Sequence, residues 1–143
     1  MVDSRSKGSR GELQVIKIFK EEFGDLIPVE NIRRNLTQYQ QKSCCDIIVA
    51  DTWACEVKNY KSGSWFKSEW WAQTKASAAQ SHLIPILFYR FDRTPFRCVL
   101  PLYAINKSYA LDDETHSWPT DDKAVTPVVV DLETGLMIMR EWL

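Results

Sequence analysis

The chain has 143 residues, of which 45% are apolar and 26% are charged, and its formal net charge is −1. This size and composition predict one globular domain with a buried core. No apolar stretch approaches the ~20 residues of a membrane span, and the N-terminus lacks the features of a signal peptide. These properties argue against a membrane-spanning or secreted protein, and we expect a cytoplasmic one.

The first predicted element is a helix over residues 9–23. Apolar side chains recur at helical spacing from Leu13 to Phe23, and a glycine follows that can end the helix. Glu12 lies on the same face as the apolar residues and would point toward the core. A second interpretation is equally open, in which Ser9 and Glu12 form a capping box at the start of the helix.

A β-hairpin is the next strong prediction. After a short strand near Asn31–Arg34 and a polar loop over 37–43, residues 45–50 and 53–59 are rich in apolar and β-branched side chains. If residues 50–52 form the connecting loop, Asp46 lies directly opposite Glu56. Directly opposed like charges destabilise a sheet, so this pairing needs an explanation.

The remaining elements complete an α/β chain on the α+β borderline, built on a central mixed sheet. We predict a helix over 66–81 whose Ala72, Ala76 and Ala79 form a small-residue stripe facing the sheet. A buried strand over 83–90, a strand over 97–100 and a helical turn over 102–106 follow, and then an acidic loop over 111–122. Strands at 128–131 and 136–140 are expected to form a terminal hairpin, so the core would span about 5–105 and the hairpin extension about 125–143.

The opposed carboxylates predict a metal site. A divalent cation held between Asp46 and Glu56, with the Val57 carbonyl as a further ligand, would remove their repulsion, and Mg²⁺ prefers such oxygen ligands. Lys58 shares the strand face of Glu56 and could orient a water or neutralise developing negative charge. The plainer alternative makes Asp46 an Asx-type residue at a strand start and Glu56–Lys58 an exposed ion pair.

Positive charge gathers near this site, although the chain as a whole is slightly acidic. Residues 111–122 hold five acidic side chains and no Lys or Arg, which leaves the rest of the chain with a net positive charge. A basic surface around acidic metal ligands suits a polyanionic substrate, whereas a scattered, solvated surface is the alternative. The basic residues concerned are Arg5, Lys7, Arg10, Arg33, Arg34, Lys42, Lys58, Lys61, Lys67 and Lys75.

The cysteines and tryptophans have structural interpretations. Cys44, Cys45, Cys55 and Cys98 lack paired zinc spacing and are predicted to be reduced, small hydrophobic residues. Four of the six tryptophans are expected to pack in the core; these are Trp53, Trp65, Trp70 and Trp71.

The pattern Asp46…Glu56-Val57-Lys58 resembles the signature of the PD-(D/E)XK nuclease superfamily. The segment Lys7-Gly8-Ser9-Arg10-Gly11-Glu12-Leu13 is similar to the opening of archaeal-type Holliday junction resolvases and their phage relatives, and Trp70-Trp71-Ala72-Gln73 resembles the phage members. The likeness spans about residues 5–92. Cys45 stands where the superfamily name has proline, a departure that is frequent among resolvase-like members.

The resemblance implies a restriction-endonuclease-like fold and a metal-dependent endonuclease. Glu12, Asp46, Glu56 and Val57 would bind Mg²⁺, with Mn²⁺ as a substitute. Lys58 would be the catalytic lysine, and Gln73 a weaker helical contributor. Backbone phosphates would be contacted without sequence readout by Lys7, Arg10, Arg33 and Arg34, and we assign Lys42 and Lys61 to the same surface.

The same resemblance implies a homodimer that cuts branched DNA in a prokaryotic or phage-infected host cell. Some of the tryptophans could then form a dimer face or act as a wedge against unstacked bases. Two other functions stay open at this point. One is a restriction- or repair-type nuclease on duplex or flap DNA. The other is a catalytically silent DNA-binding module that retains the nuclease-like fold.

Overall fold

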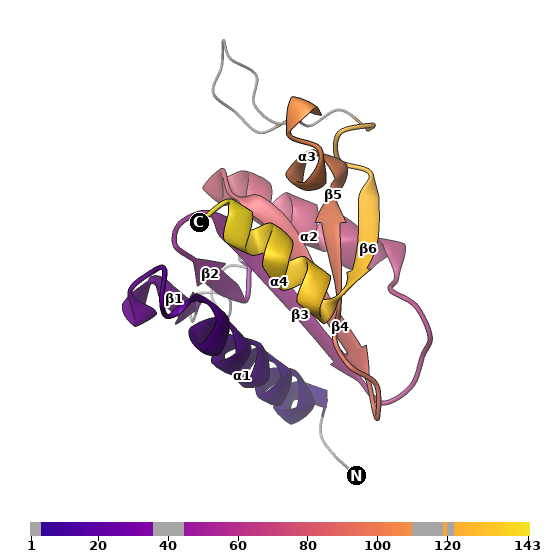
Figure 1. Ribbon diagram of the computed structural model, residues 1–143. Coiled ribbons are helices and arrows are strands. Elements are labelled where there is room, and N and C mark those ends of the chain that lie inside the picture. The colour runs from indigo at the N-terminus through magenta and orange to yellow at the C-terminus, as the bar shows by residue number, and fades with distance from the viewer. Residues whose placement is uncertain (1–3, 36–44, 110–118, 120–121) are drawn as a thin grey trace.

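The computed structural model describes residues 4–35, 45–109, 119 and 122–143 (Figure 1). The predicted polar loop, Cys44 and Lys42 therefore lie outside the described residues, and so does most of the predicted acidic loop. Among the described residues, no helix is both long and apolar enough to cross a membrane.

A six-stranded mixed sheet forms the centre of the molecule, and its strands follow one another in chain order. Among the described strands, only β3 and β4 are parallel, and every other neighbouring pair is antiparallel. The prediction of a mixed α/β sheet is thus confirmed. The strands are β1 (Ile32–Arg34), β2 (Ile47–Val49), β3 (Trp53–Tyr60), β4 (Ile84–Phe91), β5 (Arg97–Pro101) and β6 (Pro127–Asp131).

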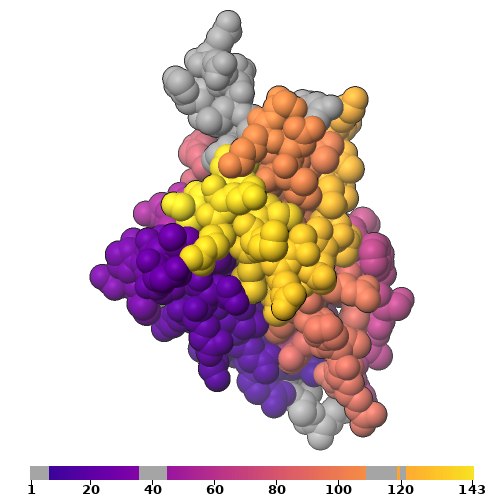
Figure 2. Space-filling model, in the orientation of Figure 1, coloured from indigo at the N-terminus to yellow at the C-terminus, as the bar shows by residue number. Residues whose placement is uncertain are grey.

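Helices cover both faces of this sheet. Parallel strands need a crossover connection, and α2 (Ser68–Ser81) supplies it between β3 and β4. It packs on one face, whereas α1 (Ser4–Phe23) and α4 (Leu132–Glu141) pack on the other (Figure 1). Figure 2 shows the surface of α4 between α1 and the segment of β5 and α3 (Leu102–Ile105). Two 3₁₀ helices, η1 (Val29–Asn31) and η3 (Lys107–Tyr109), complete the described elements.

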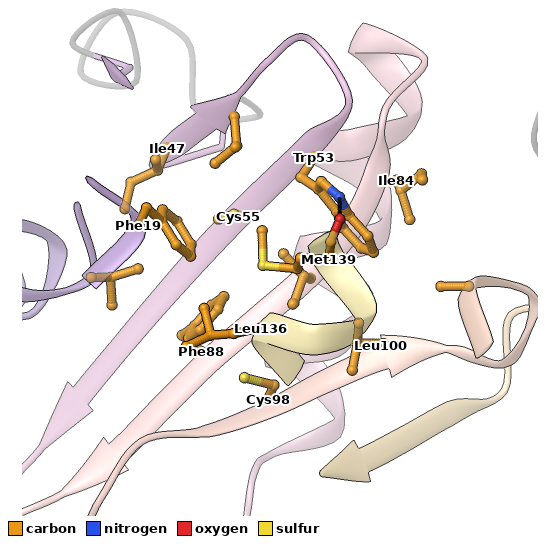
Figure 3. Close-up of a cluster of buried hydrophobic side chains, with 14 of the residues drawn as sticks. Phe19, Ile47, Trp53, Cys55, Ile84, Phe88, Cys98, Leu100, Leu136 and Met139 are labelled. Atoms are coloured by element: carbon orange, nitrogen blue, oxygen red, sulfur yellow. Dashed lines mark hydrogen bonds between the residues drawn. The ribbon is translucent and has the colours of Figure 1, made fainter. Parts of the chain in front are cut away.

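The main core lies between the sheet and the α1–α4 layer (Figure 3). Phe19 of α1 meets Phe88 of β4 edge to face, with ring centroids 5.3 Å apart. The indole N–H of Trp53, which is fully buried, donates to the Met139 carbonyl oxygen at 3.3 Å. Burial of large apolar side chains from both layers is what holds the strands that carry the site.

The first helix is longer than predicted, and the face that it packs against the sheet differs from the predicted one. It begins at Ser4, so Ser9 and Glu12 lie inside it and the capping-box interpretation is wrong. Val15 and Phe19 are fully buried, whereas Leu13 is 54% exposed. The expectation for Glu12 holds instead, because it lies one turn before Val15 and is itself buried.

The predicted terminal hairpin is wrong, because a helix follows β6. The Asp131 carboxylate caps this helix, α4, by accepting the backbone N–H of Thr134 at 2.8 Å. Gly135, which we expected in a turn, lies inside α4, where a Cβ would come within 2.5 Å of the Cys98 sulfur. Leu136 and Met139 are buried at helical spacing, so the core extends beyond 105 to the C-terminal helix.

The second helix is confirmed within two residues of its predicted start, but its predicted buried stripe is wrong. Ala72, Ala76 and Ala79 are exposed. The buried side chains of α2 are Trp70, Trp71, Thr74, Ser77 and Ala78. The two tryptophans, rather than the alanines, pack against the sheet. Their packing determines which side of α2 faces the site.

Candidate active site

The hairpin of β2 and β3 has the predicted register. Ile47 pairs with Cys55, and the Asp46 N–H donates to the Cys55 carbonyl oxygen at 2.9 Å. One step further along, this register sets Asp46 opposite Glu56. The connecting residues Ala50 and Asp51 adopt left-handed φ angles of 51° and 48°, as tight hairpin turns require.

Both opposed carboxylates are buried and hydrogen-bonded. Asp46 Oδ2 accepts the backbone N–H of Val57 at 2.8 Å, and Glu56 Oε1 lies 3.3 Å from the hydroxyl of Ser77 on α2. The exposed fractions of Asp46 and Glu56 are 9% and 2%. The interpretation of Glu56 and Lys58 as an exposed surface ion pair is therefore wrong.

These side chains line one open pocket of about 380 Å³. The ladder of β2 and β3 begins at the Ile47–Cys55 pair, so among the described residues the end of β3 beyond Glu56 has no partner on that side. The pocket occupies this place, between α1 and α2. Its lining consists of Gly8, Glu12, Asp46, Glu56, Val57, Lys58, Asn59, Tyr60 and Gln73.

Helix α1 brings Glu12 to the pocket by packing very closely on β3. A Cβ at Gly11 would lie 2.9 Å from the Cβ of Asn59, so only glycine permits this approach. The Asn59 amide also donates to the carbonyl oxygen of Lys7 at 2.9 Å, which ties the start of α1 to the same strand.

Arg34 of β1 holds the Glu12 carboxylate. Its Nε donates to Glu12 Oε2 at 2.6 Å, and its terminal nitrogen donates to the Ser9 hydroxyl at 3.0 Å. Because β1 side chains alternate, Arg33 points to the other side and pairs with Asp51 at 3.2 Å in the solvent. The two adjacent arginines therefore have different surroundings.

Burial is the main cause of the electrostatic strain in the pocket. Desolvation, followed by the charge of Glu12, raises the pKa of Asp46 to about 6. Desolvation, followed by the charge of Asp46, raises the pKa of Glu56 to about 9. The two carboxyls share a hydrogen bond, so near neutral pH the metal-free pair retains a proton.

The donor chemistry of the pocket fits a hard divalent cation. Carboxylates from α1, from the residue before β2 and from β3 line it. A cation between Asp46 and Glu56 would offset the burial and the repulsion that raise their pKa values. Within the described residues, no three His, Cys, Asp or Glu side chains already form a metal-holding cluster. The Glu12 carboxylate lines the pocket and is at the same time paired with Arg34.

The remaining predicted site residues fall into two groups. Gln73 of α2 lines the pocket with Lys58, as expected. The basic residues predicted to contact phosphates are more dispersed: Arg10 and Lys61 are exposed, Lys7 forms an ion pair with Asp92, and Arg34 is engaged by Glu12. Their contact with DNA stays a prediction.

Sequence reasoning missed three residues of the site: Tyr60 and Asn59, which line the pocket, and Ser77, whose hydroxyl donates to Glu56. Two of the three carried a usable signal. Tyr60 follows Glu56 and Lys58 at the same two-residue spacing along β3, and Ser77 lies four residues after Gln73 on α2. Asn59 gave no such signal, because its role depends on how closely α1 approaches.

The chain is similar to known proteins in sequence and in fold. Residues 3–134 match the family described as “Phage putative PDDEXK endonuclease”. The fold is similar to that of Hjc, a Holliday junction resolvase from the archaeal hyperthermophile Archaeoglobus fulgidus, with a TM-score of 0.52 and 13% sequence identity. This similarity covers 94% of the chain and 99% of Hjc, and it establishes the restriction-endonuclease-like fold. No curated protein matches the chain.

Proposed function

Because this chain belongs to the family of phage PDDEXK endonucleases, we propose that it is a Mg²⁺-dependent DNA endonuclease that hydrolyses phosphodiester bonds in four-way junctions. The observation that carries the proposal is the buried pair Asp46 and Glu56, which shares a pocket with Lys58. Burying two carboxyl groups side by side costs stability, and groups with such perturbed pKa values cluster at functional sites.

Each pocket residue has a chemical task in this proposal. Asp46 and Glu56, with Glu12, would hold Mg²⁺ or Mn²⁺, which when bound supplies a Lewis acid and lowers the pKa of a coordinated water. Lys58 lies two residues from Glu56 on the same strand face and would neutralise charge that develops on the phosphate. Gln73 approaches from α2 and would orient the attacking water.

The preference for junctions rests on the fold. The chain shares its fold with a protein described as a Holliday junction resolvase. Two symmetric incisions across a junction require two active sites, and a homodimer with twofold symmetry supplies them. We therefore include a homodimer in the proposal, acting in the cytoplasm of a prokaryotic or phage-infected cell.

Cleavage of an immobile four-way junction and of its matched linear duplex tests the proposal, with Mg²⁺ and with a chelator. We expect paired, symmetric nicks in the junction alone, which the chelator and the variant Asp46→Asn abolish. Equal cutting of both DNAs would retain the endonuclease and reject the junction preference. Tight binding without any cutting would instead indicate a DNA-binding module that retains the nuclease fold.

A further inference from the structure

Beside the pocket lies a group of aromatic side chains that the proposed hydrolysis does not use. We call it the aromatic platform, and it consists of Tyr60, Trp65, Phe66 and Trp70. Tyr60 stacks on Trp70 with ring centroids 5.1 Å apart and an interplanar angle of 8°. Trp65 lies against Phe66 at 5.7 Å. The inner members are anchored on the sheet, since Phe66 also meets Tyr89 of β4.

The outer rings of the platform remain open to solvent. Tyr60 is 41% exposed and Trp65 is 54% exposed, whereas Trp70, on which Tyr60 stacks, is buried. Large aromatic side chains normally bury their surface, so two exposed rings that belong to one connected aromatic group indicate a binding surface. Tyr60 is supported by the buried Trp70 ring, and Trp65 is supported by the partly buried Phe66 ring.

The platform is continuous with the candidate active site. Glu56, Lys58 and Tyr60 alternate along β3 and share one face, and Tyr60 lines the pocket together with the other two. Residues on one strand face recur about every 7 Å. The Tyr60 ring therefore lies within the reach of one nucleotide from a phosphate held at Lys58.

Positive charges surround the aromatic rings. Lys67 Nζ lies 5.7 Å from the centroid of the Trp70 ring, and the Arg97 guanidinium lies 6.0 Å from that of Trp65. Lys61, the residue after Tyr60, is exposed. Exposed aromatic faces interleaved with cations are the combination that binds single-stranded nucleic acid, where bases stack and phosphates are neutralised.

We propose that the aromatic platform binds an unpaired nucleobase next to the scissile phosphate, so that the enzyme prefers DNA whose bases are unstacked at the cleavage point. The inference rests on the proposed nuclease function, because it takes the position of the scissile phosphate from the pocket. A second copy of the chain is the competing occupant. The surrounding cations favour a polyanion over an identical, equally basic surface.

The test measures DNA binding in the presence of a chelator, so that it does not depend on cleavage. Fluorescence anisotropy compares a duplex with a short single-stranded gap against the fully paired duplex of the same sequence. The variants are Tyr60→Ala and Trp65→Ala, with Tyr60→Phe and Trp65→Phe as conservative counterparts that keep a ring. Met137→Ala is the matched control, because Met137 is also a large exposed apolar side chain but lies on α4, outside the platform.

We expect each alanine variant to lose about tenfold or more in affinity for the gapped DNA, as for the loss of one base–aromatic stack. Affinity for the paired duplex should change little, and the phenylalanine variants and Met137→Ala should resemble the wild type. A 2-aminopurine in the gap should be quenched by the wild type and not by Tyr60→Ala.

Equal loss of affinity for both DNAs would overturn the platform while leaving the nuclease intact. An alanine variant that changes the oligomeric state by light scattering, with unchanged DNA selectivity, would also overturn it and assign the platform to a second copy. Selective binding of gapped DNA by a wild type that cuts no DNA would support the platform and reject the proposed function. Circular dichroism of every variant confirms that the fold is retained before these comparisons are made.

Discussion

At the scale of single residues, the pocket is a compromise between stability and chemistry. Glu56 is buried opposite Asp46, and the raised pKa values of both record the cost of placing their charges there. Buried, opposed carboxyl groups destabilise the metal-free protein, and a bound ligand that neutralises their charges would remove this cost.

We expect Glu56→Gln to stabilise the metal-free protein at pH 8 by on the order of 2 kcal/mol. The Glu56 carboxyl group binds its proton more tightly in the folded state than in the unfolded state, because folding raises its pKa from 4.5 to about 9. Stability therefore falls as pH rises through this window, and glutamine removes the fall. Urea unfolding between pH 5 and pH 9 measures it, and the exposed Glu30→Gln is the control. If the stability of the variant fell with pH as steeply as that of the wild type, Glu56 would not be the group responsible.

The proposed role of Lys58 leads to a second prediction. Lys58→Ala should lower the cleavage rate by about 100-fold or more, because a cation that stabilises transition-state charge is lost. DNA affinity should remain within a few-fold of the wild type. Single-turnover cleavage and a binding titration separate these effects, and Lys20→Ala on the exposed side of α1 is the control. Equal losses in binding and in rate would make Lys58 a phosphate contact instead.

Part of this residue-scale picture could be predicted from the sequence. The opposition of Asp46 and Glu56 depends only on strand alternation and on the length of the 50–52 connection, which are local properties. The pairing of Glu12 with Arg34 could not be predicted, because the two residues belong to elements far apart in the chain. Arg34 was accordingly expected on the DNA surface.

At the scale of elements, the close contact between α1 and β3 positions the third carboxylate. Gly11 allows it, and Gly8 in the same helix provides a comparison, since a Cβ at Gly8 would have no atom within 4 Å. The helix thus contains one glycine with a steric reason and one without.

We expect Gly11→Ala to destabilise the protein by about 1–3 kcal/mol, because the new methyl group collides with Asn59. Gly8→Ala should instead stabilise it by up to about 1 kcal/mol, as alanine favours a helix. Thermal unfolding of the two variants gives the comparison. If the two substitutions changed the stability equally, helix propensity and not the α1–β3 contact would govern residue 11.

The C-terminal helix shows why element prediction failed there. Glu133-Thr134-Gly135 has the composition of a turn, and the apolar residues around it fit a strand as well as a helix. The decisive feature is tertiary: Gly135 sits where α4 touches Cys98, a contact that no local pattern reveals. By contrast, β4 was predicted because a buried central strand is a continuous apolar run.

Removal of the α4 cap should be measurable on its own. Asp131→Ala should cost about 1 kcal/mol, because the Thr134 N–H loses its acceptor. The exposed Glu141→Ala at the other end of α4 is the control and should leave stability unchanged or slightly higher. Urea unfolding of both variants provides the test. An unchanged midpoint for Asp131→Ala would show that packing alone maintains the helix.

At the scale of the whole molecule, the site joins elements that are distant in the chain. The pocket is lined from α1, from the β2–β3 hairpin and from α2, and these elements lie on both faces of the sheet. A cation bound there would link the two layers. Ligand binding to the folded state alone stabilises the fold as a whole.

We therefore expect Mg²⁺ to raise the melting temperature of the wild type by several degrees when it is present at about 100 times its dissociation constant. Asp46→Asn should show a much smaller rise, because one ligand is lost. Differential scanning calorimetry with Mg²⁺ and with a chelator makes the measurement without DNA. The same rise in both proteins would place the cation elsewhere.

The hydrogen bond between the Asp46 and Glu56 carboxyls has a further consequence for cation uptake. A ligand pair that holds a proton near neutral pH must release it when a cation binds, so binding becomes an exchange of one cation for another. The observed heat of Mg²⁺ binding should then vary with the ionisation enthalpy of the buffer, and the apparent affinity should rise with pH up to about 9. Protons would thus compete with Mg²⁺ for the same two side chains, and low pH would act as a competitive inhibitor of cation binding.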